Sequence, residues 1–359
     1  MTAAGYISER RRTTTASAAS ENTPVASRRA LLRWYGAHRR DLPWRKTRDP
    51  YRIWLSEIML QQTRVAAVLE HYRIFLERFP DIEALAAASE ADVLAAWSGL
   101  GYYRRARMLR HCAQQIVDQH GGSFPRRSES LFALPGIGRY TAAAIASIAF
   151  REPVAVVDGN VERVLQRLIG STLTSRQTWD HAQAFLAPSR PGDFNQAMME
   201  LGATVCLPHE PRCLVCPLRQ WCMTRGEEAR HAKPALRQQK KEIWCALDWR
   251  EGDGNGGGNG KVRLVKRPRK ASLMAGMWEL PQSSVPPCPF SAAAHWRTFR
   301  HSITVTNYTV HVLRSQSSRQ LGLPDDWFAT KSEWIEVDSI QQLPITGLTR
   351  KILKASGMI

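Results

Sequence analysis

The segment from Leu134 to Asn160 constrains the fold of this chain more than any other feature of its sequence. It opens with the turn Leu134-Pro135-Gly136-Ile137-Gly138, and an apolar run with helical composition follows. Glycine lets a backbone come close to another molecule, and the free amides at a helix N-terminus attract anions. The turn therefore predicts either a plain connection between two helices or a helix N-terminus that grips a phosphate.

A carboxylate stands near the end of this segment. Asp158, in Val157-Asp158-Gly159-Asn160, lies at the start of the next predicted helix. A phosphate-gripping turn followed by a fixed carboxylate suggests chemistry on DNA. The whole segment resembles the helix-hairpin-helix and following aspartate of the endonuclease III superfamily of DNA glycosylases. The resemblance implies that Gly136 and Gly138 contact DNA.

Tyr140 narrows the reaction that this resemblance implies. In relatives that also cut the DNA strand, the hairpin carries a lysine that attacks the sugar as a Schiff-base nucleophile. This chain has Tyr140 at that position, and a phenol does not form an imine. The resemblance therefore implies a monofunctional glycosylase, which removes a base and leaves the strand intact.

Four cysteines form a second constellation, Cys-x6-Cys-x2-Cys-x5-Cys, within 17 residues. Four thiolates in so short a loop suit one metal centre, and the adjoining prolines keep the loop from becoming helical. Spacing alone leaves an iron–sulfur cluster, a structural zinc and unrelated thiols open. The spacing is also similar to the one that ends the endonuclease III-like domain. That resemblance implies a [4Fe–4S] cluster held by Cys206, Cys213, Cys216 and Cys222, with the basic Arg212 and Arg219 beside it as part of a DNA-contact surface.

The third motif is the helix predicted to start at Asp49-Pro50, a good N-cap and first-turn pair. Glu57 shares a face of this helix with Ile53, Trp54 and Leu60. A carboxyl in such surroundings has its pKa raised, which favours a proton donor, although a Glu at the rim of an apolar helix reads the same way. The stretch resembles the signature helix of the MutY-type adenine DNA glycosylases, in which the matching glutamate is the catalytic acid.

Length and charge agree with that family. A chain of 359 residues favours two domains, and a net charge of +18 with a pI near 10.1 indicates a polyanionic partner. A generally sticky basic protein has similar charge but rarely 12 tryptophans and a four-cysteine loop. Seven cysteines with four in one cluster do not form a disulfide framework. We therefore expect a cytoplasmic monomer, at the nucleoid of a bacterium, with Cys112, Cys245 and Cys288 as ordinary thiols.

The predicted organisation has four parts. Residues 1–27 have the composition of a disordered tail; a transit peptide for an organelle has a similar composition and is the less favoured alternative. No apolar run reaches membrane-spanning length. Residues 28–224 form an all-helical glycosylase domain, with the cysteine loop at 206–222. A linker, 225–240, precedes an α+β domain, 241–359, so the fold class is mainly α. Predicted helices lie near 28–37, 50–61, 63–78, 89–97, 103–119, 138–150, 159–169, 177–187, 192–204 and 347–356, and strands near 244–249, 262–265, 305–313 and 334–337.

The C-terminal region resembles the Nudix-like domain that MutY enzymes carry. A working Nudix hydrolase needs a Gly-x5-Glu-x7-Arg-Glu-x2-Glu-Glu magnesium box, and nothing in this chain fits it. Gly276 and Glu279 are too isolated to hold metal. We therefore interpret the domain as a module that recognises the lesion.

By resemblance, the enzyme removes adenine that is paired with 8-oxoguanine or guanine in duplex DNA during base excision repair. Glu57 protonates the base, and Asp158 stabilises the cationic sugar. Tyr140 and Asn160 position the sugar and the second carboxylate. Glu200 matches a family glutamate near the adenine, and a helix-surface residue is the alternative.

Further residues are DNA-contact candidates by resemblance. Gln62, on the Glu57 helix and next to Thr63, and Tyr102, after Gly99-Leu100-Gly101, match the family's intercalating pair. A packed loop aromatic is the alternative for Tyr102. The neighbouring arginines then contact phosphates, namely Arg104, Arg105 and Arg107.

One motif departs from the family. A Phe-Ser-His loop of the C-terminal domain reads the oxidised guanine in relatives, and here the loop is Phe299-Arg300-His301. A planar guanidinium at Arg300 can bond to the oxidised base or to its phosphate. An arginine at this position is also compatible with a looser or different preference for the base opposite adenine than in relatives.

Three other functions fit the sequence less well. A bifunctional glycosylase/lyase lacks its hairpin lysine here, and a Nudix hydrolase lacks its magnesium box. A damage-binding protein without catalysis needs no acid pair, and Glu57 and Asp158 argue against it.

Overall fold

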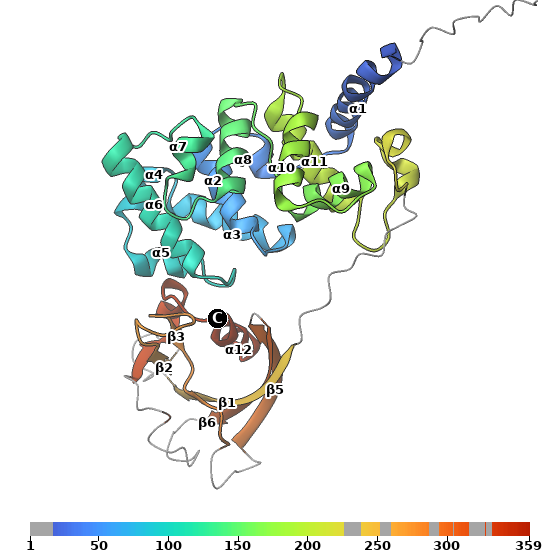
Figure 1. The fold of residues 1–359 in the computed structure, drawn as a ribbon. Helices are drawn as coiled ribbons and strands as arrows, with labels where there is room; N and C mark the ends of the chain where they lie inside the picture. Colours follow the sequence, from blue (N-terminus) through green and yellow to red (C-terminus); the bar gives the residue numbers. More distant parts are fainter. Residues whose placement is uncertain are drawn as a thin grey trace, which may run out of the picture. The chain divides into compact units, whose positions relative to one another are not determined.

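The computed structural model describes residues 17–225, 238–251, 260–286, 294–303, 305–315, 327 and 332–359. Helices make up the structure as far as Arg225, and strands dominate from Gln239 onward (Figure 1). The predicted linker 225–240 falls mostly outside the described residues, as does Cys288, while Cys112 and Cys245 are buried thiols as expected. No helix in the described ranges has the length and hydropathy needed to span a bilayer.

Contacts between residues divide the chain into two compact units. The first comprises Met1–Asp41, Arg126–Ser128 and Ala142–Ala232. The second comprises Leu42–Pro125, Glu129–Thr141 and Lys233–Ile359. One of the passages of the chain from the second unit to the first, between Thr141 and Ala142, lies within a helix, Arg139–Phe150.

The helices of the helical region follow the predicted pattern closely. They are α1 Ser17–His38, α2 Pro50–Leu60, α3 Val65–Arg78, α4 Ile82–Ala87, α5 Glu90–Ala96, α6 Arg104–His120, α7 Ser128–Phe132, α8 Arg139–Phe150, α9 Gly159–Ile169, α10 Ser175–Phe185 and α11 Pro191–Thr204. Short 3₁₀ turns add η1 Pro43–Arg45, η2 Cys213–Val215 and η3 Arg219–Trp221.

Local capping explains where several of these helices begin. The Asp49 side chain accepts a hydrogen bond from the Tyr51 amide, and Pro50 occupies the first helical position of α2. Thr174 and Gln177 form a reciprocal capping box at the start of α10. These signals are local in sequence, and the predicted starts of α2 and α9 are confirmed to the residue.

The structure corrects four predictions about the helices. Helix α1 begins at Ser17, so the predicted disordered tail is wrong from that residue onward, and residues 1–16 lie outside the described part. Helix α2 ends at Leu60, which leaves Gln62 beyond the helix rather than on it. Helices α4 and α7 were not predicted, because six and five residues are too few to display a helical period.

Each part of the helical region has its own apolar core. In the first unit, α1, α9, α10 and α11 pack around Leu31, Val164 and Phe194, which are almost completely buried. In the second unit, aromatic rings meet edge to face, with Trp97 against Phe75 and Trp54 against Phe124. These cores hold α2 and α9, which carry the two candidate carboxylates.

The C-terminal region contains a mixed sheet, so its predicted α+β character is confirmed. Its strands are β1 Gln239–Arg250, β2 Lys261–Lys266, β3 Trp278–Glu279, β4 Gln282–Ser283, β5 His295–Ile303, β6 Thr306–Ser315 and β7 Ser332–Glu336. The order is β3-β2-β1-β6-β5, with β4 paired to β1 and β7 paired to β2. Strands β1 and β6 run parallel from the Gln239–Thr306 pair to Asp248–Ser315, whereas the other pairs are antiparallel.

One helix completes the core of the sheet. The 3₁₀ segment η7 Val337–Gln342 leads to α12 Gly347–Ala355, whose Leu348, Ile352 and Leu353 lie in the same apolar cluster as the strand residues. The Thr346 side chain caps the helix by accepting from the Thr349 amide. The predicted closing helix is therefore confirmed.

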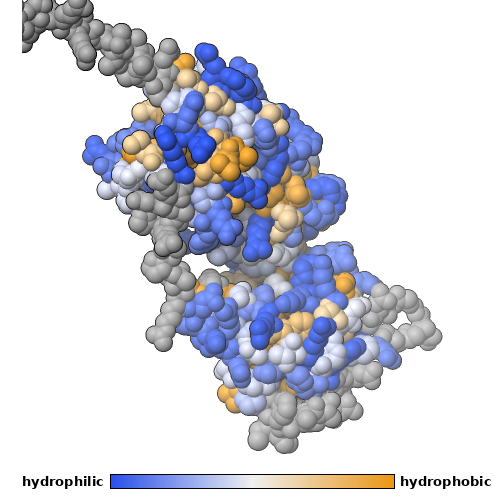
Figure 2. Space-filling model, turned by 90° about the vertical axis from the view of Figure 1, so that its right-hand side faces the viewer, coloured by the Kyte–Doolittle hydropathy of each residue, from blue (hydrophilic) through white to orange (hydrophobic). Residues whose placement is uncertain are grey.

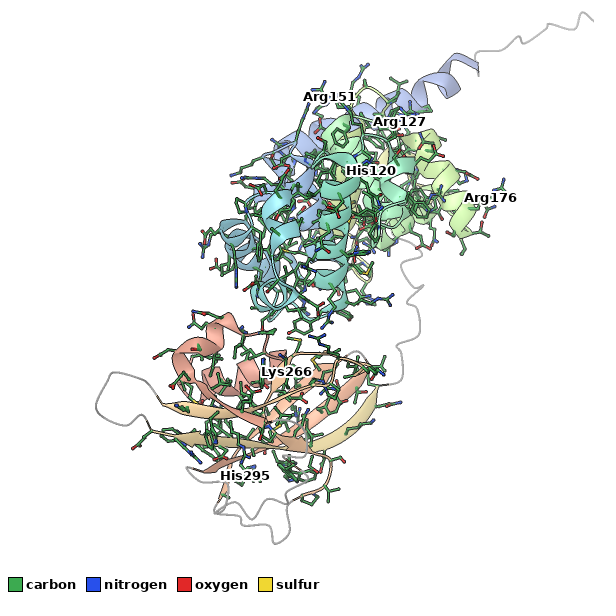
Figure 3. All side chains as sticks on the ribbon, turned by 90° about the vertical axis from the view of Figure 1, so that its left-hand side faces the viewer. His120, Arg127, Arg151, Arg176, Lys266 and His295 are labelled. Atoms are coloured by element: carbon green, nitrogen blue, oxygen red, sulfur yellow. The ribbon has the colours of Figure 1, made fainter. Side chains whose placement is uncertain are left out.

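Basic side chains project from the surface of the described structure. Arg151 and Arg176 point away from the helices in Figure 3, and polar residues dominate the face drawn in Figure 2. The net charge of +18 is in part a surface property that suits a polyanion.

Two helical glycines test how closely the helices pack. A Cβ at Gly192, in α11, would lie 2.7 Å from the Ser147 carbonyl oxygen and 2.8 Å from the Ile148 Cα in α8. We expect Gly192→Ala to lower the free energy of unfolding by about 1–3 kcal/mol, because backbone atoms cannot move aside cheaply. Gly36→Ala, in α1 with no atom within 4 Å of the added Cβ, is the matched control. It should be neutral or stabilising by up to about 1 kcal/mol in urea titrations, and equal loss in both variants would contradict the close packing.

Candidate active site

Glu57 lies on α2 and is buried, with 6% of its surface exposed. The Tyr140 hydroxyl donates a hydrogen bond of 2.5 Å to Glu57 Oε2. Both residues belong to the second unit, and Tyr140 is the second residue of α8, directly after the hairpin turn. The structure thus adds a contact of Tyr140 with the first candidate carboxylate, and its expected role at the sugar and the second carboxylate stays a prediction.

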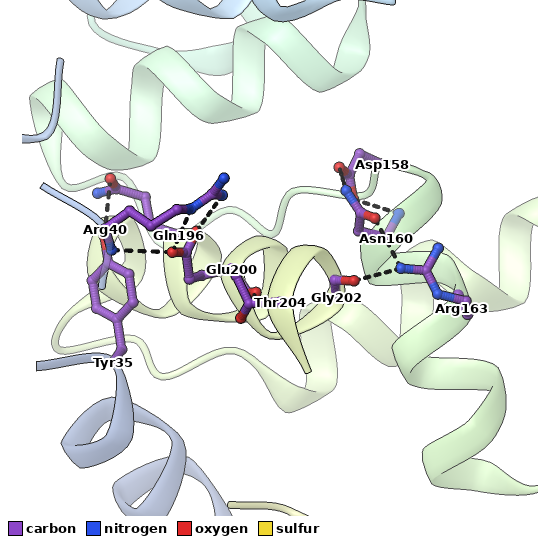
Figure 4. A network of polar contacts seen from close by, with 9 residues as sticks. All are labelled: Tyr35, Arg40, Asp158, Asn160, Arg163, Gln196, Glu200, Gly202 and Thr204. Atoms are coloured by element: carbon purple, nitrogen blue, oxygen red, sulfur yellow. Dashed lines mark hydrogen bonds and ion pairs between the residues drawn. The ribbon is translucent and has the colours of Figure 1, made fainter. Parts of the chain in front are cut away.

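Asp158 is the N-cap of α9, as its place in the sequence predicts. Its Oδ1 accepts from the backbone amides of Asn160 at 2.9 Å and Val161 at 2.7 Å. Its Oδ2 accepts from Asn160 Nδ2 at 3.0 Å (Figure 4). A helix N-terminus favours a negative charge, and three donors hold this carboxylate in one orientation.

Arg163 extends this network into the rest of the first unit. Its Nη2 donates to Asn160 Oδ1 at 2.9 Å and to the Gly202 carbonyl at 2.7 Å (Figure 4). Its Nε donates to the Cys206 carbonyl at 2.8 Å. Burial lowers the pKa of Arg163 despite the nearby negative groups. A continuous set of hydrogen bonds therefore joins Asp158 to α11 and to the cysteine loop.

Glu200, on α11, is completely buried, which rules out the helix-surface alternative. Arg40 binds it through both nitrogens of its fork, with Nε to Oε1 at 2.8 Å and Nη2 to Oε2 at 2.7 Å, and through its backbone amide at 3.1 Å (Figure 4). The hydrogen bonds that Arg40 donates to Glu200 raise the pKa of Arg40. A bidentate pair of this kind fixes the carboxylate in a defined plane.

The hairpin turn has the geometry that its glycines predict. Gly136 has a φ of +78°, and a Cβ there would lie 2.8 Å from the Met108 Cβ. Both the backbone conformation and the packing therefore require glycine at this position. Gly136 and Gly138 are exposed, as a phosphate-binding turn demands.

The predicted intercalating residues share an unusual backbone state. Gln62 has a φ of +56° and Tyr102 a φ of +49°, and both side chains are exposed. Such left-handed conformations are uncommon for residues other than glycine and concentrate at functional sites. The adjacent Thr63 hydroxyl donates to the Gln61 carbonyl, so it helps hold the turn after α2.

Two of the three arginines after Tyr102 differ from the prediction. Arg104 is exposed and stays a candidate phosphate contact. Arg105 is wrong as a phosphate contact, because its guanidinium turns inward and donates to backbone carbonyls that include Ile58 O at 2.7 Å. Arg107 pairs with Glu90 at 2.8 Å, so it is also engaged within the protein.

Several DNA-contact candidates line one groove of the second unit, with a volume of about 1000 Å³. They come from the turn after α2, the turn before α6, the start of α6, the hairpin and β5, and they are Gln62, Tyr102, Arg104, Gly136 and His301. The residues are distant in sequence, so their convergence supports one binding surface.

The C-terminal motif is not a loop. Phe299, Arg300 and His301 lie in β5, paired with β6, and Phe299 is 7% exposed and belongs to the core of the sheet. The predicted loop is therefore wrong, because Phe299 lies in a strand, and its contact with DNA stays a prediction. Arg300 is exposed, while His301 is half-buried, and burial lowers its pKa.

The four cysteines line one small cavity together with Arg167 and Arg219. Arg167 donates from Nη1 to Cys206 Sγ at 3.3 Å and to the Leu207 carbonyl at 2.6 Å, and the Cys222 thiol donates to the Arg167 carbonyl. Burial is the main cause that raises the pKa of Cys216 to about 11, and the neighbouring thiols contribute less. Among the described residues no group of three or more His, Cys, Asp or Glu lies close enough together to hold a single metal ion. The set is four half-buried sulfurs with cations beside them, a donor set that suits a sulfur-ligated cluster rather than a lone hard ion.

Sequence reasoning missed two arginines that organise the candidate site, Arg40 and Arg163, and gave a third, Arg105, a different role. Their partners are buried carboxylate, amide and carbonyl oxygens, most of them distant in the sequence. An arginine three residues after Asn160 on a helix was the one available signal, because that spacing places the two side chains on one face.

Comparison with known proteins begins with a family model. Residues 55–187 match the model described as HhH-GPD superfamily base excision DNA repair protein. This range contains Glu57, the hairpin and Asp158.

Individual proteins extend the match. The adenine DNA glycosylase of Rattus norvegicus is 41% identical over 73% of this chain and 61% of its own length. That of Schizosaccharomyces pombe is 31% identical over 71% of this chain and 68% of its own length. Among solved structures, a thermostable thymine-DNA glycosylase is 29% identical with a TM-score of 0.55, over 58% of this chain and 99% of that one. The chain thus spans less than two thirds of the rat relative.

Proposed function

The chain belongs to the adenine DNA glycosylase family of the HhH-GPD superfamily, and from this premise we propose that it removes adenine paired with 8-oxoguanine or guanine in duplex DNA. The observation that carries the proposal is the buried Glu57 hydrogen-bonded to Tyr140, together with Asp158 held at the N-terminus of α9. Hydrolysis of an N-glycosidic bond needs an acid for the leaving base and a carboxylate for the cationic sugar, and the chain supplies both.

Glu57 is the general acid of this mechanism. The adenine is flipped out of the duplex into the protein, and Glu57 donates a proton to N7, which makes the base a better leaving group. The Tyr140 hydroxyl donates to Oε2 and so leaves the proton of the neutral acid to the other oxygen of the carboxyl. Tyr140 thus orients the acid by its hydrogen bond.

Asp158 stabilises the positive charge that develops on the sugar as the bond breaks. The two amide donors and the Asn160 side chain hold its oxygens in place before the substrate arrives. Water then completes the hydrolysis. No amine stands at the Tyr140 position, so the strand is left intact and the enzyme is monofunctional.

The cysteine loop supports a [4Fe–4S] cluster as the resident cofactor, held by Cys206, Cys213, Cys216 and Cys222. When bound, the cluster supplies a covalent closure of the loop. The chain's own contribution is the pair Arg163 and Arg167, which donate to the carbonyls of Cys206, Leu207 and Pro208. The ordered loop then presents the basic Arg212 and Arg219 to phosphates.

The C-terminal sheet is proposed as a Nudix-like module that reads the opposite base. The exposed Arg300 in β5 is the candidate reader, in place of the serine of relatives. The Lys351 ammonium donates to the Arg300 carbonyl at 2.8 Å, which ties this strand to α12. The enzyme acts as a monomer on its duplex.

The first test of this function is catalytic. We expect Glu57→Gln and Asp158→Asn each to lower single-turnover release of adenine by at least about 10²–10⁴-fold, because each removes charge or proton transfer in the transition state. Binding to the lesion duplex, measured by anisotropy, should change little. Wild-type turnover in either variant refutes its assigned role, and a borohydride-trapped covalent complex of the wild type in high yield refutes the monofunctional reaction.

The second test is the metal content. The purified protein should be brown and should contain about four iron and four sulfide ions per chain. The Cys222→Ser variant should lose the colour and bind DNA more weakly. Cys112→Ser, at a buried thiol on α6 that is not part of the four-cysteine motif, should keep both properties. Stoichiometric zinc without iron in an anaerobic preparation is the result that rejects the cluster.

The third test concerns the opposite base. If Arg300 bonds to the oxidised guanine, Arg300→Ala should shrink the ratio of activity on 8-oxoguanine to guanine duplexes by about ten- to a hundredfold, with little change in salt dependence. If it holds a phosphate, affinity should fall for both duplexes alike and the salt slope should drop by about one. The second pattern contradicts its role as the reader.

A further inference from the structure

Arg105 is the residue that links the two predicted intercalating segments. It lies on α6, three residues after Tyr102, and its guanidinium turns toward the end of α2. Its Nη1 donates to the carbonyls of Ile58 at 2.7 Å, Met59 at 3.1 Å and Gln61.

The second terminal nitrogen serves the other segment. Arg105 Nη2 donates to the carbonyls of Leu100 at 3.4 Å and Gly101 at 3.3 Å, and to Thr63 Oγ1 at 3.3 Å. The Arg105 guanidinium carbon also lies 5.3 Å from the centre of the Tyr102 ring and 5.4 Å from that of Trp97. One planar group thus bonds the backbone on both sides.

These bonds satisfy groups that have no helical partner. The last carbonyls of a helix point out of its C-terminus, and a cation there interacts favourably with the helix dipole. Burial of the charge is nevertheless costly, and it lowers the pKa of Arg105 to about 10. Six oxygen acceptors surround this half-buried guanidinium, so Arg105 is held within the protein as a structural link between the two segments.

The segments that Arg105 joins are both strained. Gln62 and Tyr102 have left-handed backbones, and each follows directly on a carbonyl that Arg105 binds, Gln61 or Gly101. Such conformations persist where the surroundings over-determine them. In this region, Arg105 supplies that constraint to both turns at once.

We propose that Arg105 is the positioning residue of the wedge, holding Gln62 and Tyr102 in place so that both side chains can enter the duplex as the adenine leaves it. The proposal rests on the proposed function and adds a residue that does not itself contact DNA. Lysine cannot replace it, because a single ammonium nitrogen cannot reach both sets of carbonyls.

The experiment compares Arg105→Lys with Arg110→Lys. Arg110 lies on the same helix and donates to the single carbonyl of Ala88, at the C-cap of α4, so it is the matched control. Single-turnover adenine release is measured on a duplex with adenine paired to 8-oxoguanine and on one with adenine opposite an abasic site, where little pairing opposes extrusion. Rates are normalised to the fraction of folded protein by circular dichroism.

We expect Arg105→Lys to lose at least about tenfold on the paired duplex, several-fold less on the unpaired one, and Arg110→Lys to match the wild type. In the double variant with Tyr102→Ala, the Arg105 loss should largely disappear, because both changes act through the wedge. Equal loss on both duplexes, or additive loss with Tyr102→Ala, overturns the proposal. If Arg105→Lys does not fold, Arg105→Gln, which keeps one donor group, is subjected to the same comparison. If the wild type releases no adenine, the proposed function is refuted. The role of Arg105 in holding the two turns is then tested separately by amide hydrogen exchange, which should be slower at residues 61–63 and 99–103 in the wild type than in the variant.

Discussion

The capping of α9 by Asp158 is the interaction on which the first unit depends. One carboxylate satisfies two orphan amides of the helix and takes a third bond from Asn160. The helix that begins there carries Arg163 and Arg167, whose bonds hold α11 and the cysteine loop. Because the same oxygens serve as helix cap and as candidate catalytic group, their orientation is fixed by the fold before any substrate binds.

Arginine has two separate functions in this protein. Exposed arginines such as Arg104 and Arg300 give the surface its positive charge, which suits the phosphates of DNA. Others are turned inward and bind buried oxygens: Arg40 binds the carboxylate of Glu200, and Arg105 binds carbonyls at the end of α2. A guanidinium serves this purpose well because its donors form a rigid fork that bridges two acceptors.

The second unit joins the acid to the hairpin in a similar way. Glu57 and Tyr140 lie 83 residues apart, and their hydrogen bond ties α2 to the first turn of α8. The exposed glycines of the hairpin precede that turn directly, so the proposed phosphate-binding turn and the residue that bonds to the proposed acid lie on one short piece of backbone. A shift of the hairpin backbone would therefore move Tyr140 and, through its hydrogen bond, the Glu57 carboxyl.

The sequence by itself determined what is local. Caps, proline and glycine signals specify the starts of α2 and α9 and the hairpin turn, because their partners lie within three residues. Motif resemblance added Glu57, Asp158 and the cysteines. Only the tertiary structure decided that Arg105 faces inward, that Phe299 sits in the core of a strand and that Tyr140 binds Glu57. The physical reason is that an arginine, a phenol or an aromatic ring is compatible with either solvent or burial. The choice depends on which oxygens and apolar surfaces distant segments bring to it.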